Sequence, residues 1–387
     1  IRKLSNLQGR IIYMSYINVN IQNVEIFSVS MPLKSRIKMA GVILDTADNL
    51  IIKISGDNGL IGWGEASSAP TMTGEFVEGM VSAAKFLKSM VVGSDIKNLA
   101  DIKVLLNTPL YGNQGAISAI EMAMLDLFAR TNNCSLIELL GGPKRDSSRA
   151  LYMIAGGTID EEIARAKEKQ KEGFDAFKIK VGSNSAKEDL MRCSSIRKAL
   201  GNTAFISADA NEGFNLTEAK TFASEAGESG IDFFEQPVPA DDISDIKDVA
   251  SSTSVPLGAD EGVHSLTDIS ELVAASAVKG CSLKTIKLGG MVAVLEAAKH
   301  AHALGLNINL AGKVAETSIS GNAVSILSCL VPNINWDVSI TNQYLEVDPV
   351  SESLTIDKGR VRAPKGLGLG TEVDLDILKP FIKSHYS

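Results

Sequence analysis

From about residue 146 onward, the sequence alternates between short apolar segments and segments with helical patterning. The apolar segments have the length and composition of buried strands, and most gaps between them hold a helical pattern such as EEIARAKEKQKE. Eight such segments can be identified: ALYMIA (150–155), AFKIKV (176–181), AFISADA (204–210), IDFFEQP (231–237), PLGADE (256–261), SLKTIK (282–287), NINLAG (307–312) and NINWDV (333–338). Eight strands separated by helices predict an α/β fold, a (β/α)8 barrel of the TIM type.

A smaller α+β domain is predicted before the barrel. It has three segments with strand patterning, the last two joined by the hairpin turn GDNG, followed by two helical segments: residues 18–31, 38–55, 60–66, 75–91 and 115–130. We therefore expect three regions, with boundaries at residues 1–145, 146–345 and 346–387. The last region is too turn-rich for barrel helices, and we expect it to pack back on the first domain. The first thirteen residues are expected to be an upstream extension, with Met14 as the biological start.

Composition excludes several classes of partner. The chain of 387 residues has a formal net charge of -8 and no run of Lys and Arg interleaved with aromatic residues, so we expect no nucleic-acid partner. No apolar run reaches membrane-spanning length, so we expect no membrane partner. The four cysteines lie far apart without a CxxC spacing, which fits reduced thiols in a cytoplasmic protein. The expected partner is a small molecule.

Charged residues end five consecutive predicted strands of the barrel. In this fold the carboxyl ends of the strands meet at one rim, where active sites lie. The second strand carries Lys178 and Lys180, which point to the same face because side chains alternate along a strand. The next four strands end with Asp209, Glu235, Asp260 and Lys284, at spacings of one strand–helix unit.

Three carboxylates on adjacent strands would repel one another unless a cation lay between them. Oxygen ligands alone suit a hard divalent ion, so Asp209, Glu235 and Asp260 predict a Mg²⁺ site. The lysines of the second and sixth strands would then face each other across a bound substrate carboxylate. We interpret Lys180 as a base whose pKa is lowered by the neighbouring Lys178, and Lys284 as the proton carrier on the opposite face.

These motifs resemble the enolase superfamily, in its muconate-lactonizing-enzyme subgroup, over nearly the whole chain from about Ile21 to Leu378. The motifs are FKIKVG, ADAN, EQP, ADE and LKTIKLGG. The resemblance implies Mg²⁺-assisted abstraction of a proton α to the carboxylate of a small-molecule substrate. It implies that Lys284, six positions before the second glycine of the GG pair, is the catalytic lysine rather than Lys287. It also implies that the amino-terminal domain caps the barrel mouth and selects the substrate, and we expect a homo-oligomer.

Within the superfamily, GWGEASSAPTMTGE, YGNQGAISAIEMAMLDL, SADANEGF and VAETSIS resemble dipeptide epimerases. Those enzymes present a D-x-D on the eighth strand that holds the dipeptide's ammonium group. Here Asp337 matches the second aspartate, whereas Asn335 stands where the first would be. The predicted activity is therefore an isomerase that epimerises or racemises a dipeptide or N-acyl amino acid. A muconate-type cycloisomerase, which shares the catalytic motifs, is the alternative.

Four further residues are expected at or near the site. Asn211 is expected in the substrate-binding set, where it supports the site by hydrogen bonding, and Glu261 is expected on the face opposite Asp260, in a structural pair. Glu316, after the seventh strand, could orient a lysine or contact substrate, or it could be an ordinary acid at a helix start. Arg36 could meet an anionic substrate group at the mouth, or it could be a solvated loop residue.

Overall fold

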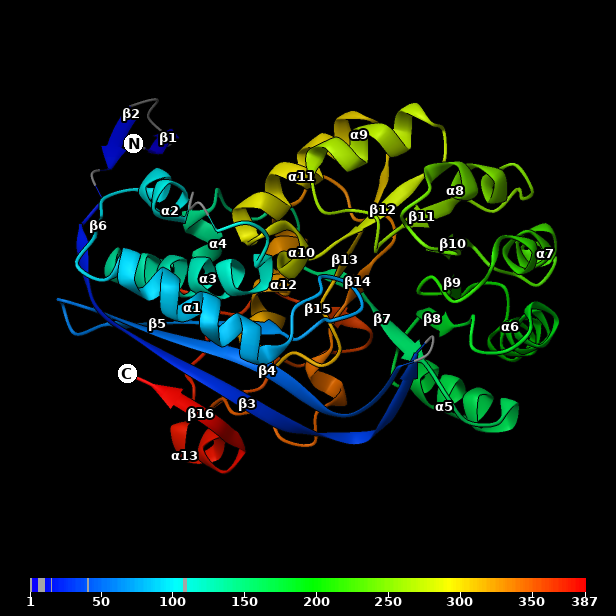
Figure 1. The fold of residues 1–387 in the computed structure, drawn as a ribbon, viewed down its shortest axis with the longest axis horizontal. Coiled ribbons are helices and arrows are strands. Elements are labelled where there is room, and N and C mark those ends of the chain that lie inside the picture. Colours follow the sequence, from blue (N-terminus) through cyan, green and yellow to red (C-terminus); the bar gives the residue numbers. More distant parts are fainter. Residues whose placement is uncertain (1, 6–10, 15, 40–41, 107–109) are drawn as a thin grey trace.

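The computed structural model describes residues 2–5, 11–14, 16–39, 42–106 and 110–387 of the chain (Figure 1). Its centre is a closed ring of parallel strands, in which each strand pairs with the next and the last pairs with the first. In ring order these are β7 (Ser148–Ile154), β8 (Ala176–Lys180), β9 (Phe205–Asp209), β10 (Phe233–Glu235), β11 (Leu257–Ala259), β12 (Gly280–Leu283), β13 (Asn307–Ala311) and β14 (Val338–Ser339). The ring confirms the predicted (β/α)8 barrel.

Helices surround the ring and follow the strands in turn: α5 (Ile159–Lys171), α6 (Ala186–Leu200), α7 (Leu216–Ala226), α8 (Ile243–Ala250), α9 (Leu266–Ala274), α10 (Thr285–Leu288), α11 (Met291–Ala303) and α12 (Ser318–Leu330). Capping boxes explain where α5, α6 and α7 begin, because Thr158, Ser185 and Asn215 each accept a bond from the backbone three residues on. Helix α12 is buried along its whole length. No helix in the described part of the chain is long and apolar enough to cross a membrane.

Two of the differences between predicted and observed strand bounds change the place of a predicted site residue. The sixth ends at Leu283, so Lys284 is the residue before α10 rather than part of a strand. The eighth was expected over residues 333–338, but β14 begins only at Val338. The preceding residues form a turn in which Trp336 and Asp337 are buried and Asn335 is exposed. Trp336 stacks on Phe233 at a centroid distance of 4.1 Å, and Asp337 has a φ of 65°. Burial of Trp336 gives this turn the apolar character of a strand.

The amino-terminal domain is an antiparallel sheet covered by helices (Figure 1). Its sheet contains β3 (Val19–Met39), β4 (Val42–Gly56) and β5 (Ile61–Ser67), which confirms the expected meander, and β6 (Asp95–Ile96) pairs with β3. The helices are α1 (Val77–Val91), α2 (Leu99–Leu106), α3 (Gln114–Thr131) and α4 (Leu136–Leu139). A separate hairpin is formed by β1 (Arg2–Ser5) and β2 (Ile11–Met14).

The end of the chain returns to both parts of the molecule. Strand β15 (Arg360–Val361) pairs with β7 of the barrel, whereas β16 (Ile382–Tyr386) pairs with β3 of the amino-terminal sheet. Two 3-10 turns, Asn342–Tyr344 and Lys379–Phe381, and helix α13 (Leu375–Leu378) lie between or beside these strands. Arg130 of α3 donates to the carbonyl of Thr371 at 2.6 Å and pairs with Glu372, which ties this segment to the helical layer.

A buried carboxylate joins the two domains. Glu65 on β5 is fully buried, and it accepts hydrogen bonds from the backbone and hydroxyl groups of Thr317 at 2.8–3.1 Å and from the backbone of Ser320 at 3.0 Å. These donors belong to the amino-terminal end of α12, where a carboxylate satisfies free N–H groups. Asn49 on β4 donates to Glu65 and to the carbonyl of Ala315. The sheet is therefore fixed to the loop that follows the seventh barrel strand.

Strand β5 also approaches helix α3 very closely. An added Cβ at Gly64 would lie 2.0 Å from the carbonyl oxygen of Ala119. This oxygen belongs to the backbone of α3, so it cannot turn aside as the end of a flexible side chain could. Because one element would have to move, we expect Gly64→Ala to lower the free energy of unfolding by about 1–3 kcal/mol, measured by urea denaturation.

The matched control is Gly79→Ala in α1, where an added Cβ meets no described atom within 4 Å. Alanine is the better helix former, so this variant should gain roughly 0.5–1 kcal/mol. Wild-type stability of Gly64→Ala would contradict the close packing of β5 on α3.

Candidate active site

Three carboxylates lie on neighbouring strands at the carboxyl-terminal rim of the barrel. Asp209 is the last residue of β9, Glu235 is the last residue of β10, and Asp260 follows β11 directly. Asp209 is level with Glu235 on one side and with Lys180 of β8 on the other. All three residues are almost completely buried, with at most 1% of the surface of each residue exposed. The strand pairing therefore collects these acids on one arc of the rim.

Lysines stand on the two strands that flank this arc. Lys180 is the last residue of β8, and Lys284 follows β12. In a closed ring of eight strands, β8 and β12 are four positions apart in both directions. Lys180 and Lys284 therefore approach the centre of the rim from opposite sides, with the carboxylate arc between them.

Each carboxylate of the arc contacts a lysine. Lys180 Nζ lies 2.6 Å from Asp209 Oδ2, and Lys178 Nζ pairs with Glu235 while lying 3.6 Å from the same Asp209 oxygen. Asp260 pairs with Lys284 and with the buried Lys287, whose Nζ lies 2.7 Å from Asp260 Oδ1. Such pairing is expected, because a buried charge without a partner costs several kcal/mol.

Burial and the lysines act in opposite directions on these acids. Burial favours the neutral form of Asp209, but the charges of Lys180 and Lys178 outweigh it, so the pKa of Asp209 is lowered. Lys284 and Lys287 lower the pKa of Asp260 against the same effect of burial. For Glu235 burial dominates, and the pKa is raised. Lys178 shows the reverse balance, since Glu235 and Asp209 raise its pKa although burial lowers it.

The donor set of the arc fits a hard divalent cation, because it consists of carboxylate oxygens on adjacent strands without histidine or cysteine. In the described residues, no three acidic, histidine or cysteine side chains are arranged to hold a metal ion, and each acid of the arc contacts a lysine instead. The ammonium groups thus supply the positive charge that a metal would supply. A cation could replace them if the acids turned from the lysines towards it.

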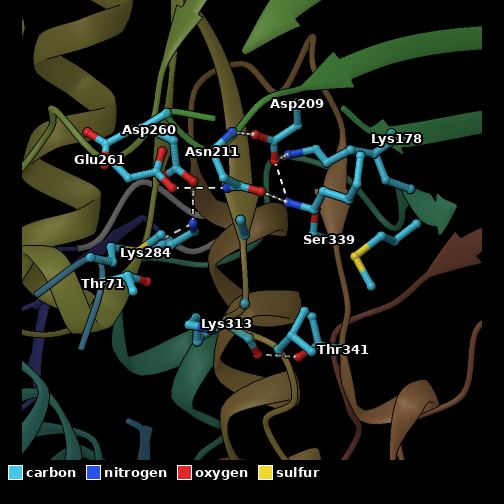
Figure 2. A pocket seen from close by; sticks show the side chains of 18 of the residues that line it. Thr71, Lys178, Asp209, Asn211, Asp260, Glu261, Lys284, Lys313, Ser339 and Thr341 are labelled. Atoms are coloured by element: carbon cyan, nitrogen blue, oxygen red, sulfur yellow. Dashed lines mark hydrogen bonds and ion pairs between the residues drawn. The ribbon is translucent and has the colours of Figure 1, made fainter. Parts of the chain in front are cut away.

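A cavity of about 360 Å³ opens over the rim (Figure 2). The carboxylate arc and its flanking strands contribute Lys178, Lys180, Asp209, Asp260 and Lys284 to its wall. The opposite arc contributes Leu151 and Met153 from β7, Lys313 from the loop after β13, and Ser339 and Thr341 from β14 and its end. A substrate in this cavity would contact both arcs.

The amino-terminal domain contributes two residues to the cavity wall. Thr71 and Met72 lie in the loop after β5, where backbone bonds from Met72 and Thr73 to the carbonyl of Ala69 fix the turn at 3.0 and 2.8 Å. Met72 Sδ lies 3.5 Å from Lys284 Nζ and accepts its hydrogen bond. This loop therefore covers the site and reaches the lysine that follows the sixth strand.

Asn211 lies at the centre of the polar network. Its Oδ1 accepts a bond from Lys180 Nζ at 2.6 Å, its backbone N–H donates to Asp209 at 3.0 Å, and its side-chain amide donates to Glu261 at 2.9 Å (Figure 2). Glu261 lines the cavity, so its expected position on the face opposite Asp260 is wrong. The reason is that β11 ends at Ala259, beyond which the alternation of a strand no longer applies. Burial and Asp260 raise the pKa of Glu261 to about 7.

Asp337 does not line the cavity. It lies before β14, level with Arg149 near the start of β7, and the two side chains form an ion pair at 2.8 Å. This is the amino-terminal end of the barrel, opposite the rim. The expected role of Asp337 in substrate binding is therefore corrected: the residues at the end of the eighth strand that line the cavity are Ser339, Ile340 and Thr341.

Arg36 and Glu316 also lie outside the cavity wall. Arg36 is exposed on β3, and its Nε lies 2.6 Å from Asp45 on β4, so it faces solvent in the long hairpin rather than the site. Glu316 is buried in the loop after β13, against Gly312, and its Oε2 has no hydrogen-bond partner in the described part of the chain. Burial and the nearby Glu65 raise the pKa of Glu316 to about 8.

The sequence interpretation missed several residues of the cavity wall. Lys313 follows the seventh predicted strand, so the same strand-end reasoning that identified Lys180 would have found it. Ser339 and Thr341 were hidden by the misplaced eighth strand. Thr71 and Met72 give no local signal, because their place over the barrel depends on how the two domains pack.

The family models agree with this architecture. Residues 21–141 match the "Mandelate racemase / muconate lactonizing enzyme, N-terminal domain", and residues 161–377 match the domain described as "Enolase C-terminal domain-like". The chain belongs to the enolase superfamily. Both parts of the fold described above are therefore accounted for by one family.

Relatives in the superfamily cover the chain almost completely but have different activities. A chloromuconate cycloisomerase of Pseudomonas sp. is 28% identical, over 95% of this chain and 100% of its own. The L-Ala-D/L-Glu epimerase of Bacillus subtilis is 29% identical, over 91% of this chain and 96% of its own. The crystal structure of the N-succinyl Arg/Lys racemase of Bacillus cereus has a TM-score of 0.89 at 26% identity, covering 95% and 99% of the two chains. All three are isomerases, and this superfamily member is an isomerase as well.

The buried Glu316 generates a prediction about stability. Because its pKa rises from an ordinary value of 4.5 to about 8 on folding, the folded protein binds this proton more tightly than the unfolded chain. The resulting stabilisation is fully present below about pH 4.5 and is lost as the pH rises towards about 8. We expect Glu316→Gln, which cannot ionise, to lose less stability than the wild type between about pH 5 and pH 8 in urea denaturation.

Glu225→Gln, at an exposed position of α7, is the control and should follow the wild-type pH profile. Parallel profiles for Glu316→Gln and the wild type would show that Glu316 is not protonated in the folded protein at neutral pH.

Proposed function

We propose that this isomerase inverts the α-carbon of an N-acylated amino acid by removing and returning the proton α to its carboxylate. The observation that carries the proposal is the placement of Lys180 and Lys284 on opposite sides of one carboxylate arc, in the same cavity. Inversion of a carbon requires proton transfer on both faces, and opposed amines meet that requirement.

In the proposal, Asp209, Glu235 and Asp260 hold a Mg²⁺ ion. When bound, the ion supplies the positive charge that stabilises the enediolate formed by loss of the α-proton. Support comes from the all-oxygen donor set and from the positive charge that lysines already supply to the same acids.

The chain's own residues would divide the proton transfer between them. Lys180 takes the α-proton on one face, and Lys284 delivers a proton to the other, with the roles exchanged for the opposite enantiomer. Asn211 orients the Lys180 ammonium through its 2.6 Å bond. Lys178 pairs with Glu235 and stays charged, because Glu235 and Asp209 raise its pKa against the effect of burial.

The eighth strand favours an N-acyl amino acid over a dipeptide with a free ammonium group. The residues at its end that line the cavity are Ser339, Ile340 and Thr341, whose side chains are hydroxyl-bearing or apolar. No carboxylate of the described residues lines the cavity from β13, β14 or β7. An ammonium group directed to this side would therefore lack a counter-charge, whereas an acyl group would not need one.

A cycloisomerase is the second candidate, because the chloromuconate cycloisomerase of Pseudomonas sp. matches 95% of this chain over the whole of its own length. Such a reaction needs proton transfer by only one lysine. Incubation in deuterium oxide separates the two candidates. A racemase incorporates α-deuterium into recovered N-acyl amino acid as well as product, whereas a cycloisomerase leaves a panel of N-acyl amino acids and dipeptides unlabelled.

The two lysines can be tested separately once a member of that panel exchanges. We expect Lys180→Ala and Lys284→Ala each to lower racemisation by about 10²–10⁴-fold, the range typical of a general acid or base. Each variant should still exchange the α-proton of the one enantiomer that faces the remaining lysine. Chiral chromatography measures racemisation, and mass spectrometry measures exchange.

Lys220→Ala, at an exposed position of α7, is the matched control and should keep wild-type rates. Full racemisation by either active-site variant would refute the two-lysine mechanism. Loss of exchange for both enantiomers in each variant would also contradict it, if circular dichroism shows both variants to be folded.

The metal site gives an independent prediction. We expect Asp260→Asn to weaken Mg²⁺ binding by about 10-fold or more in isothermal titration calorimetry. Removing a metal ligand should lower the affinity at least as much as removing a residue that only hydrogen-bonds to a ligand. Asp248→Asn, at an exposed position of α8, should titrate like the wild type. An unchanged Mg²⁺ titration of Asp260→Asn would remove Asp260 from the ligand set.

A further inference from the structure

Lys313 enters the cavity from the arc opposite the carboxylates. It follows β13, and Figure 2 shows it across the cavity from Asp209 and Asp260. Its backbone is fixed, because the Lys313 carbonyl accepts bonds from Thr341 Oγ1 at 2.8 Å and from the Glu316 N–H at 3.1 Å. The side chain thus starts from a rigid point on the cavity wall.

Lys313 differs from the other lysines of the cavity in having no anionic partner. Lys178, Lys180 and Lys284 each pair with a carboxylate, but no carboxylate of the described residues lies within 4.0 Å of Lys313 Nζ. Burial, together with the charges of Lys284 and Lys180, lowers the pKa of Lys313 to about 8. The group is therefore still mostly charged at pH 7, and it forms no ion pair within the described part of the chain.

The acids around Lys313 offset its charge only in part, because Glu316 and Glu261 raise its pKa by less than burial and the neighbouring lysines lower it. The nearest acid in the sequence, Glu316, is buried outside the cavity wall and has its pKa raised to about 8, so it is largely neutral at pH 7. The neighbouring cavity residues on this arc are the hydroxyl groups of Ser339 and Thr341 and the apolar side chains of Leu151 and Met153. Such a wall suits a ligand with an apolar stem and a terminal anion.

We propose that Lys313 binds a second carboxylate of the substrate, so that the protein acts on a dicarboxylate. This inference rests on the proposed function, because the reacting carboxylate is assigned to the acidic arc and the second one to the opposite arc. A charge-assisted bond to a half-buried lysine in a cavity wall is among the stronger polar contacts. The same lysine repels a terminal ammonium group and so selects against cationic substrates.

The second carboxylate could belong either to the acyl group or to the amino-acid side chain. Two matched pairs of probes distinguish these sources. N-succinyl-L-alanine is compared with its amide N-succinamoyl-L-alanine, and N-acetyl-L-glutamate is compared with N-acetyl-L-glutamine. Within each pair only the charge of the distal group changes. β-Alanyl-L-alanine, with a distal ammonium group, is the cationic probe.

Binding of each probe to the Mg²⁺-loaded full-length protein is measured by isothermal titration calorimetry. In one pair, we expect the wild type to bind the carboxylate about 10- to 100-fold more tightly than the amide. The cationic probe should bind most weakly. Lys313→Met, which keeps the length and apolar stem of the side chain, should remove the preference, whereas Lys313→Arg should retain it. Thermal unfolding reports whether both variants are folded.

The proposal would be overturned by the absence of a preference in both pairs for the wild type, or by a preference that survives in Lys313→Met. Equal weakening of all probes by Lys313→Met would also overturn it, because a structural role would have that effect. Failure of the proposed proton-transfer mechanism would give a different experimental result. In that case Lys180→Ala and Lys284→Ala would keep full racemisation, while the binding preference, which requires no proton transfer, would be unchanged.

Discussion

Buried acids and buried lysines neutralise one another at the rim of this barrel. Asp209, Glu235 and Asp260 are shielded from water, and each would be costly as an isolated charge. In the protein alone, the lysines beside these acids supply the compensating positive charge. In our proposal a divalent ion takes over this task, which would free Lys180 and Lys284 to exchange protons with a substrate. Charge balance would thus couple metal binding to the availability of the two amines.

The closed ring gives each side of the cavity a different task. One arc, β9 to β11, carries the acids, and the strands that bound it, β8 and β12, carry the opposed lysines. The other arc, β13 to β7, carries hydroxyl groups, apolar side chains and Lys313. In this account, the residues of the first arc and its flanking strands would carry out the proton transfer, and the residues of the second arc would select the substrate. The relatives, which include a cycloisomerase, an epimerase and a racemase, differ in substrate while sharing the family.

The parts of the site that follow from a regular pattern could be predicted from the sequence. Lys180 and Asp209 end strands whose spacing repeats along the chain, and their common rim follows from the barrel topology. Asp337 was misplaced because the buried Trp336 gives a turn the pattern of a strand. Met72 could not be found locally, since it reaches Lys284 only through the packing of one domain on the other. The local sequence pattern was therefore enough to predict the residues at regular strand ends. Residues such as Met72, which reach the cavity wall through domain packing, could not be predicted from it.

The central claim is that a divalent ion lies on the acidic arc between two opposed amines. The most direct measurement is a crystal structure of the protein with Mn²⁺ in place of Mg²⁺, in which anomalous scattering locates the ion. The account predicts one ion bound by Asp209, Glu235 and Asp260, with the Nζ atoms of Lys180 and Lys284 on opposite sides of the adjacent cavity. An ion bound elsewhere, or an arc whose acids remain paired with lysines at saturating Mn²⁺, would contradict it.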